Sequence, residues 1–195
     1  MISNDDLKKL KNPDSYIKAA EHYAPLLKLM RSRFSVRSFS RKPIENDKLK
    51  AILTAGQIAP TAVNFQPQKI YVLQSDSALK KIREITNSTY DAPTVLLVCS
   101  APNKSWHSRF DSTYESGESD AAIVCTHMML EAWEQGIGSV WVLLFDPEKV
   151  RKQFALPPNI RPVCLLPIGY PAEDCLPYKP WHDVFRPLEE TVEIL

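Results

Sequence analysis

Glycine is scarce in this sequence, with 5 glycines in 195 residues. They form neither a G-x-G-x-x-G element nor a Walker-type phosphate loop. Dinucleotide-binding folds of the Rossmann type and P-loop proteins need such loops, because only glycine lets the backbone approach the phosphates closely. The G-x-S-x-G element of many serine hydrolases is missing as well. The sequence therefore argues against all three classes.

Cysteine is also rare, and the four cysteines form no C-x-x-C pair. Cys99, Cys125 and Cys164 lie in apolar stretches, where cysteine acts as a small hydrophobic residue, and Cys175 stands apart near the C-terminus. We therefore predict neither a disulfide framework nor a zinc site, and no other metal site.

An excess of charge of either sign is missing, because the formal net charge is +1. Basic residues gather only around positions 28–42, which is short for a nucleic-acid surface. The sequence shows no signal peptide and no apolar run near 18 residues. We predict a cytoplasmic protein that binds neither nucleic acid nor membrane.

What is present suits one domain over residues 1–195, with a helical N-terminal extension (1–30) and a C-terminal arm (172–195). The stretch 94–99 is apolar on both faces and predicts a central strand. Residues 101–118 carry no periodic pattern. Alternation of helices and strands predicts a helix–sheet–helix sandwich. The expected helices are 14–30 (interrupted at Pro25), 46–59, 77–86, 120–135 and a short one opening at Asp146-Pro147; the expected strands are 68–74, 94–99, 139–145 and 163–169.

Two of these helices carry clear end signals. Asn46 or Asp47 is the expected cap of the second helix, and Pro60 stops it. Gly136 is placed as the C-cap of the helix over 120–135. The apolar faces are expected to be Leu49, Ile52, Leu53 and Ile58 in the one helix, and Ile123, Met128 or His127, Leu130 and Ala132 in the other.

The segment Arg33-Phe34-Ser35-Val36-Arg37 carries two guanidinium groups and a hydroxyl. In an extended stretch Arg33, Ser35 and Arg37 point to one side. Planar guanidinium groups hold phosphate through paired, charge-assisted hydrogen bonds. A solvated basic face is the alternative, because Arg31 and Arg41 lie nearby.

The segment from Ala59 to Pro67 has two prolines that fix its backbone and the amide side chains of Asn64 and Gln66. Such groups suit the edge of a flat, polar heterocycle better than a phosphate. The alternatives are a plain helix stop and a turn in which Asn64 caps the following residues. A third segment, Phe185-Arg186-Pro187-Leu188, lies near the C-terminus.

The order of these segments resembles the FMN-dependent nitroreductase family from about Leu29 to Leu195. Five elements carry the resemblance: R-x-S-x-R at Arg33, Ser35 and Arg37; A-P-T-x-x-N-x-Q-P at 59–67; G-x-G-S at 136–139; I-G-Y-P at 168–171; and R-P-L-E-E at 186–190.

The resemblance implies an α+β, three-layer helix–sheet–helix sandwich with a mixed sheet and an extended C-terminal arm. It also implies a domain-swapped homodimer with two FMN sites at the interface. The residues implied for the cofactor are Arg33, Ser35, Arg37 and Arg186 on the phosphate, Phe34 through its backbone, and Pro60, Thr61, Ala62, Asn64 and Gln66 from the other subunit along the ring or ribityl chain.

The segment Val142–Asp146 matches a family stretch often written I-E-G-F-D. Leu143 stands where the family frequently has Glu, and Leu144 stands where it has Gly. A backbone contact to the flavin survives this change, but a role for the Glu side chain does not. We therefore expect weak selectivity between NADH and NADPH.

The resemblance implies an enzyme that uses NADH or NADPH to reduce small electron-poor acceptors (nitroaromatic, quinone or flavin-like) in a ping-pong reaction. The hydride passes through flavin N5, so no catalytic side chain is required and the four histidines need no role. Two alternatives stay open: a flavin-binding storage or sensor protein without turnover, and a relative with reductive dehalogenase or flavin-fragmenting chemistry.

Overall fold

A computed structural model describes residues 3–9, 13–14, 17 and 25–195. The chain divides into two compact units. The larger unit comprises Ser35–Leu176, and the terminal unit combines Met1–Phe34 with Pro177–Leu195. The single-domain organisation expected from the sequence stays a prediction.

The larger unit contains a four-stranded sheet in the order β1-β2-β4-β3. The strands are β1 (Gln68–Leu73), β2 (Thr94–Ser100), β3 (Gly138–Ser139) and β4 (Arg161–Gly169). All pairings between these strands are antiparallel. The resemblance implied a mixed sheet, and this was wrong for the named strands of the described residues, where parallel pairing is limited to a single bridge between Ser35 and Ser139.

Strand β2 is buried along its whole length and lies inside the sheet, as its continuous apolar sequence predicted. Its side chains alternate between two core clusters. Leu96 and Val98 pack on one face with Ile52 and Met128. The opposite cluster combines Val95, Leu97, Leu79, Ile82 and Val150.

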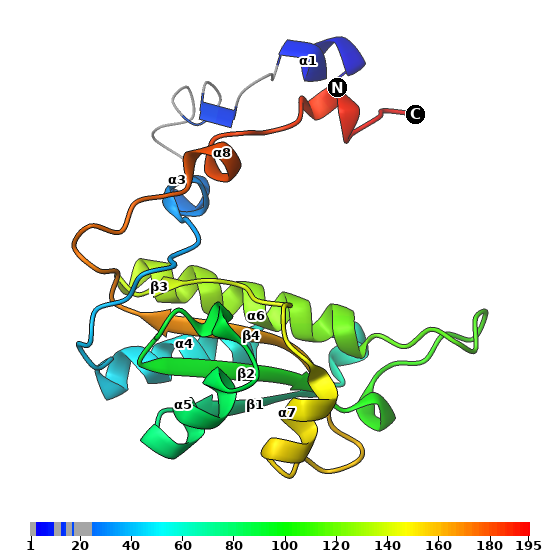
Figure 1. The fold of residues 1–195 in the computed structure, drawn as a ribbon. Coiled ribbons are helices and arrows are strands. Elements are labelled where there is room, and N and C mark those ends of the chain that lie inside the picture. The colour runs from blue at the N-terminus through cyan, green and yellow to red at the C-terminus, as the bar shows by residue number, and fades with distance from the viewer. Residues whose placement is uncertain (1–2, 10–12, 15–16, 18–24) are drawn as a thin grey trace. The chain divides into compact units, whose positions relative to one another are not determined.

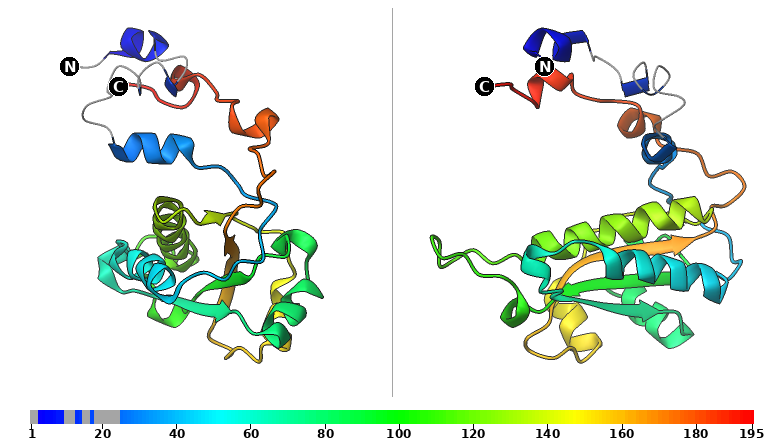
Figure 2. Two further views of the ribbon diagram at one scale, coloured as in Figure 1. Left: turned by 90° about the vertical axis from the view of Figure 1, so that its left-hand side faces the viewer. Right: turned by 180° about the vertical axis from the view of Figure 1, so that it is seen from behind.

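These clusters place α4 (Asn46–Ile58) and α6 (Gly117–Glu134) on one face of the sheet. Helices α5 (Asp76–Arg83) and α7 (Pro147–Gln153) cover the other face (Figures 1 and 2). The predicted helix–sheet–helix sandwich and its α+β class are confirmed for this unit.

Helix α4 begins at Asn46, so its cap is Glu45 and the predicted cap at Asn46 or Asp47 was wrong. Ala59 is extended before Pro60, which confirms the predicted stop. Ile58 is 74% exposed and does not belong to the buried face. The buried face turns instead toward Gly56, where an added Cβ would lie 2.8 Å from the Met128 side chain. The buried face of α4 therefore runs along Leu49, Ile52 and Gly56, and Ile58 lies outside it.

Helix α6 ends before Gly136, whose φ of 73° confirms the predicted C-terminal signal. Ile123 is 38% exposed, so its predicted place in the core was wrong. Val124 and Cys125 are buried in its stead. The helix is apolar on a broad face, and its sequence therefore left the direction of the core undetermined.

The strand predicted over 139–145 was too long, because β3 contains only Gly138 and Ser139. Val142 makes one further bridge to Leu165, and the chain then leaves the sheet. Helix α7 confirms its sequence signals: the Asp146 side chain accepts hydrogen bonds from the backbone amides of Glu148 and Lys149, and Pro147 is the first helical residue.

Three further features complete the larger unit. Helix α5 is capped by the Ser75 hydroxyl, which accepts from the Ala78 amide. Cys99, Cys125 and Cys164 are buried, as predicted. The stretch 101–118, which has no periodic pattern, contains the short 3-10 helix η3 (Pro102–Lys104). After η3 the chain folds back on itself, and His107 and Glu115 form an antiparallel β-bridge. We call residues 106–116 the hairpin.

The terminal unit contains α1 (Asn4–Lys9), α3 (Pro25–Ser32), α8 (Lys179–His182) and the 3-10 helix η4 (Leu188–Glu190). The described part of α3 runs from Pro25 to Ser32, so the predicted kink or interruption at Pro25 falls at the edge of the described residues. Most of the predicted helix between positions 14 and 25 lies outside the described residues. Arg31 binds both carboxylate oxygens of Asp14 and also contacts Asp183.

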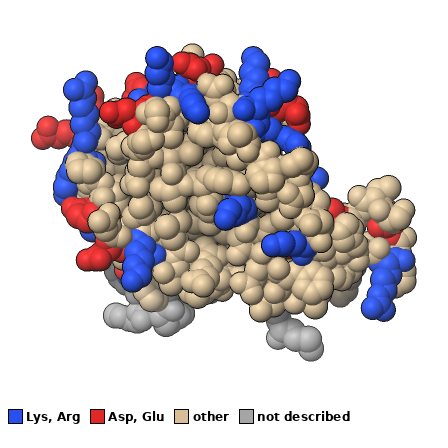
Figure 3. Space-filling model, turned by 90° about the horizontal axis from the view of Figure 1, so that it is seen from below, with Lys and Arg blue, Asp and Glu red and all other residues tan. Residues whose placement is uncertain are grey.

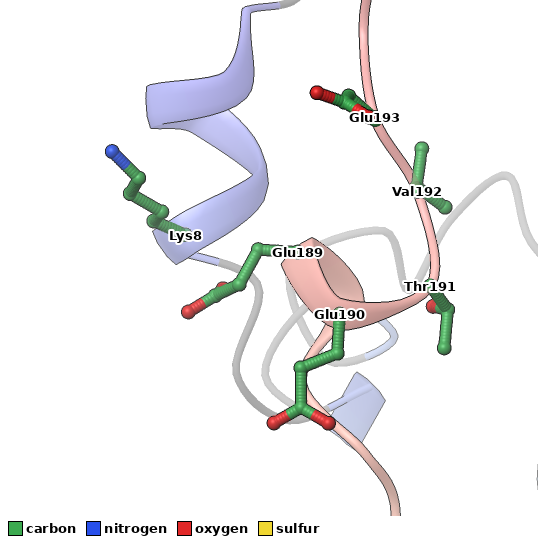
Figure 4. Close-up of a pocket in the computed structure, with 6 residues that line it drawn as sticks. All are labelled: Lys8, Glu189, Glu190, Thr191, Val192 and Glu193. Atoms are coloured by element: carbon green, nitrogen blue, oxygen red, sulfur yellow. The ribbon is translucent and has the colours of Figure 1, made fainter.

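A shallow pocket in the terminal unit is lined by Lys8 of α1 and residues 189–193 (Figure 4). Glu189 and Glu190 both project from η4 at its edge. Across the described part of the chain, no group of three or more His, Cys, Asp or Glu side chains is arranged to hold a metal ion. The pocket is therefore an acidic surface feature of this unit.

On the face shown in Figure 3, charged side chains of both signs gather along the top and the left, and the middle is mostly uncharged with a few Lys or Arg side chains. This distribution agrees with the formal net charge of +1. Of the helices that the structure describes, none combines the length and the apolar character needed to cross a membrane.

Candidate functional site

The chain around Ser35 is extended and attached to the edge of the sheet. The Val36 amide donates to the Ser139 carbonyl over 3.0 Å, and the Val36 side chain is fully buried. An added Cβ on Gly138 would lie 2.5 Å from Val36 Cγ2, so glycine is needed for this approach. Ser35 and Arg37 therefore lie on the side opposite Val36, and Arg37 Nη1 donates to the Ser35 carbonyl over 3.3 Å.

Arg33, Phe34 and Arg186 belong to the terminal unit. Arg33 is partly buried, and burial lowers the pKa of its guanidinium group. Phe34 makes an edge-to-face contact with His182, with ring centroids 6.3 Å apart. Arg186 is exposed and donates from Nε to Glu190 over 3.2 Å. Exposed pairs of this kind contribute about 0–1 kcal/mol. Arg186 could therefore leave Glu190 and bind a phosphate at little cost in free energy.

Residues 60–66, which we call the ring loop, follow α4 and have an unusual backbone. Val63, Asn64 and Gln66 have φ angles of 54°, 57° and 51°. Such angles are uncommon outside glycine, and for a β-branched residue such as Val63 they are outliers. Each strained residue costs about 1–3 kcal/mol and persists only where the surroundings hold it. The side chains of Asn64 and Gln66 are exposed, together with Val63 and Phe65.

The side chains of Thr61 and Asp120 accept hydrogen bonds from the ring loop, in addition to the backbone hydrogen bonds within it. The Gln66 amide donates to Thr61 Oγ1 over 3.0 Å within the loop. The Ala62 amide donates to Asp120 Oδ1 over 2.8 Å, and Asp120 is only 2% exposed. The sequence reasoning missed Asp120, because a carboxylate in the first turn of a helix is ordinary and no local pattern links it to Ala62.

Leu143 and Leu144 are 66% and 77% exposed, in the segment that leaves the sheet after β3. The Leu144 carbonyl accepts a hydrogen bond of 2.7 Å from Thr86 Oγ1. The Phe145 amide donates to the Leu143 carbonyl over 3.0 Å. The backbone of this segment is therefore fixed while its apolar side chains face outward, and Thr86 is a second residue that the sequence reasoning missed.

The two predicted parts of the site within the larger unit lie at opposite ends of α6. The ring loop contacts Asp120 in the first turn of α6. Ser35 pairs with Ser139 of β3, which follows the other end of the helix (Figure 1). Helix α6 has 18 residues, which is about 27 Å at ~1.5 Å per residue. One chain thus separates the two segments that the sequence assigned to the phosphate and to the ring.

The groups near Ser35 suit an anion. Among the described residues, Arg33 is partly buried and has no acidic partner, so its charge is not offset within this part of the chain. Ser139 Oγ, beside Ser35, is buried without a hydrogen-bond partner in the same described residues. Guanidinium and hydroxyl donors of this kind fit the phosphate of a flavin mononucleotide.

Tyr170, in the I-G-Y-P element, has a structural role. Its hydroxyl donates to Glu45 Oε2 over 2.5 Å and accepts from Lys48 over 3.0 Å. Lys42 lies over its ring, 4.0 Å from the centroid. The hydrogen bond from Tyr170, with a further one from Lys42, lowers the pKa of Glu45 to about 2.

We expect Tyr170→Phe to return the pKa of Glu45 toward its ordinary value, because the largest cause of the shift is removed. The folded-state pKa is lowered, so the contribution of this contact to stability is present above the ordinary pKa of Glu and is lost as pH falls toward 2. A carboxyl titration by NMR measures the change. An unchanged Glu45 titration in Tyr170→Phe would show that the backbone hydrogen bond and Lys42 hold the carboxylate without Tyr170.

The fold and the site together define an α+β protein whose sheet edge and ring loop present anion-binding and amide groups. A profile of the Nitroreductase family matches residues 30–91 and 86–170, and the chain belongs to this family. A nitroreductase family protein from Clostridium difficile 630 is 37% identical, with a TM-score of 0.79 over 85% of this chain and 95% of that chain.

Two further relatives agree with this assignment. A nitroreductase family protein from Clostridium novyi NT is 27% identical, with a TM-score of 0.68 over 75% of this chain and 84% of that chain. An "NADPH-dependent oxidoreductase" from Staphylococcus aureus is 28% identical over 178 residues, which is 81% of this chain and 71% of the relative. The family predicted from the sequence is confirmed.

Proposed function

We propose that this protein is an FMN-dependent oxidoreductase that takes electrons from NADH or NADPH and reduces small electron-poor acceptors. Membership of the Nitroreductase family supports the class of reaction. The name of the Staphylococcus aureus relative supports a nicotinamide electron donor. The donor groups around Ser35 and the amide-rich ring loop support FMN as the cofactor.

The observation that carries this proposal is the separation of the phosphate-binding and ring-binding segments by the length of α6. We therefore propose a homodimer with exchanged arms in which each FMN site takes Ser35 and Arg37 from one chain and the ring loop from the other.

In this arrangement Arg33, Ser35, Arg37 and Arg186 hold the phosphate. A phosphate near two negative charges needs more than one cation to offset its desolvation. The backbone of Phe34 lies along the ring. From the second chain, Pro60, Thr61, Ala62, Asn64 and Gln66 line the ring or the ribityl chain, where amide groups match its carbonyls and hydroxyls. Bound FMN supplies the redox chemistry by carrying a hydride equivalent between donor and acceptor.

Leu143 and Leu144 contribute their backbone and an apolar surface to the site. Both side chains are exposed, and neither carries charge. Such a surface favours flat, weakly polar acceptors such as nitroaromatic compounds and quinones. Without a Glu at position 143, the donor cleft has no side chain there to distinguish NADH from NADPH, so we propose weak selectivity.

The visible spectrum of the purified protein, before and after anaerobic NADH, tests the cofactor and electron entry together. We expect a yellow protein with one FMN per chain that NADH bleaches and a quinone re-oxidises. A colourless protein that takes up no FMN at micromolar concentration contradicts the proposal. Bound FMN that neither NADH nor NADPH reduces would instead favour a storage or sensor role.

A further inference from the structure

Asp120 carries an almost fully buried carboxylate and is not one of the residues proposed to contact FMN. It lies in the first turn of α6, is 2% exposed, and no cation among the described residues contacts it. Its negative charge is favoured there by the helix dipole. Its two oxygens accept hydrogen bonds from the ring loop and from Ser116, the residue that precedes the helix.

Asp120 Oδ1 accepts from the Ala62 amide of the ring loop over 2.8 Å. Asp120 Oδ2 accepts from Ser116 Oγ over 2.7 Å. Ser116 Oγ accepts in turn from the Trp106 amide over 3.1 Å, and the Ser116 amide donates to the Trp106 carbonyl over 2.9 Å. Ser116 and Trp106 form the base of the hairpin, so one carboxylate connects this base to the ring loop.

The hairpin itself is well anchored at the same place. Glu115 pairs with Arg161 of β4, and Glu115 Oε2 accepts from the Gly117 amide over 2.7 Å. Trp106 and Tyr114 make an edge-to-face contact across it, with centroids 6.3 Å apart. The hairpin base is therefore fixed to the sheet. The two hydrogen bonds of Asp120 connect the ring loop to this base.

The ring loop needs such a support because of its strained backbone. Val63 and Asn64 directly follow Ala62, and both have positive φ angles. A conformation of this kind persists only when its surroundings hold it. We infer that Asp120 is a positioning residue: it sets the ring loop on the flavin and couples that loop to the hairpin. This inference rests on the proposed function for its effect on flavin, but not for its effect on the loop.

Asp120→Ala removes the acceptor for Ala62, whereas Asp120→Asn keeps an amide oxygen in its place. Ser116→Ala cuts only the connection to the hairpin, and Thr126→Ala, an exposed position on the same helix, is the matched control. Amide hydrogen exchange of residues 62–66 and of Trp106 is measured on each protein as purified, followed by the Kd for FMN and by kcat and KM with NADH and a quinone.

We expect exchange at 62–66 to rise about tenfold or more in Asp120→Ala, the loss expected for one hydrogen bond to a charged group, with a similar rise in the Kd for FMN. Asp120→Asn should restore both measurements, and Thr126→Ala should change neither. In Ser116→Ala the Trp106 amide, which loses its side-chain acceptor, should exchange faster, while exchange at 62–66 and the Kd for FMN stay unchanged.

Unchanged exchange at 62–66 in a folded Asp120→Ala protein would overturn the inference. If Asp120→Ala fails to fold by circular dichroism, Asp120→Asn and Ser116→Ala decide the matter: loss of ring-loop protection in Asp120→Asn, or unchanged exchange of the Trp106 amide in Ser116→Ala, overturns the inference. A wild-type protein that binds no FMN would refute the proposed function, whereas the exchange measurement would still judge the role of Asp120.

Discussion

A heterodimer that carries Arg37→Ala on one chain and Asn64→Pro on the other is expected to keep about half of the wild-type activity. If each site takes its phosphate-binding segment from one chain and its ring loop from the other, this heterodimer has one doubly damaged site and one intact site. Proline cannot adopt the φ of 57° found at Asn64, so the substitution disrupts the ring loop locally.

The matched control places both substitutions on one chain and pairs it with a wild-type chain. In a shared-site dimer each of its two sites then contains one defect, and activity should be nearly absent. Two affinity tags isolate the heterodimers, and FMN content and NADH oxidation are measured on each. The reverse pattern, with activity only in the control, would place each site within one chain.

The shared site also predicts that dimer and cofactor depend on one another. FMN that binds only the dimer stabilises it by mass action. Dilution should therefore release FMN and abolish activity over the same concentration range, which flavin fluorescence and sedimentation measure in parallel. A monomer that retains FMN would contradict the shared geometry.

The second large effect concerns the phosphate. Arg37→Ala and Arg186→Ala should each weaken FMN binding by about 1.5–3 kcal/mol, the range for hydrogen bonds to charged groups. This is about 10- to 150-fold in Kd, measured by flavin fluorescence quenching. The pair between Arg186 and Glu190 does not oppose this expectation, because it is exposed and contributes little.

Arg41→Ala is the control for these variants, because Arg41 is exposed and lies outside the matched positions. In the sequence alone, Arg31 and Arg41 are equivalent, because both lie outside the matched positions. The structure distinguishes them, because Arg31 pairs with Asp14 and Asp183, and its removal would disturb the terminal unit. If Arg41→Ala weakens FMN binding as much as Arg37→Ala, the site is a diffuse basic surface.

Local signals in the sequence were sufficient for several elements. The apolar run at β2 predicted a central strand, because only a strand covered on both faces tolerates such a run. Asp146 and Pro147 predicted the start of α7, and Gly136 predicted the end of α6. The motif order from Arg33 to Glu190 was sufficient for the family. Each of these features depends on residues that are neighbours in the chain or on their order along it.

Only the tertiary structure decided which faces are buried and which segments meet. Ile58 and Ile123 are exposed, while Gly56 faces Met128 and Val124 where α4 meets α6, and a close approach at a glycine leaves no apolar signal in the sequence. The contact between Asp120 and Ala62 joins residues 58 positions apart through a backbone amide, which no side-chain pattern records. The separation of Ser35 from the ring loop follows from the path of α6 across the sheet, so it exists only in the folded chain.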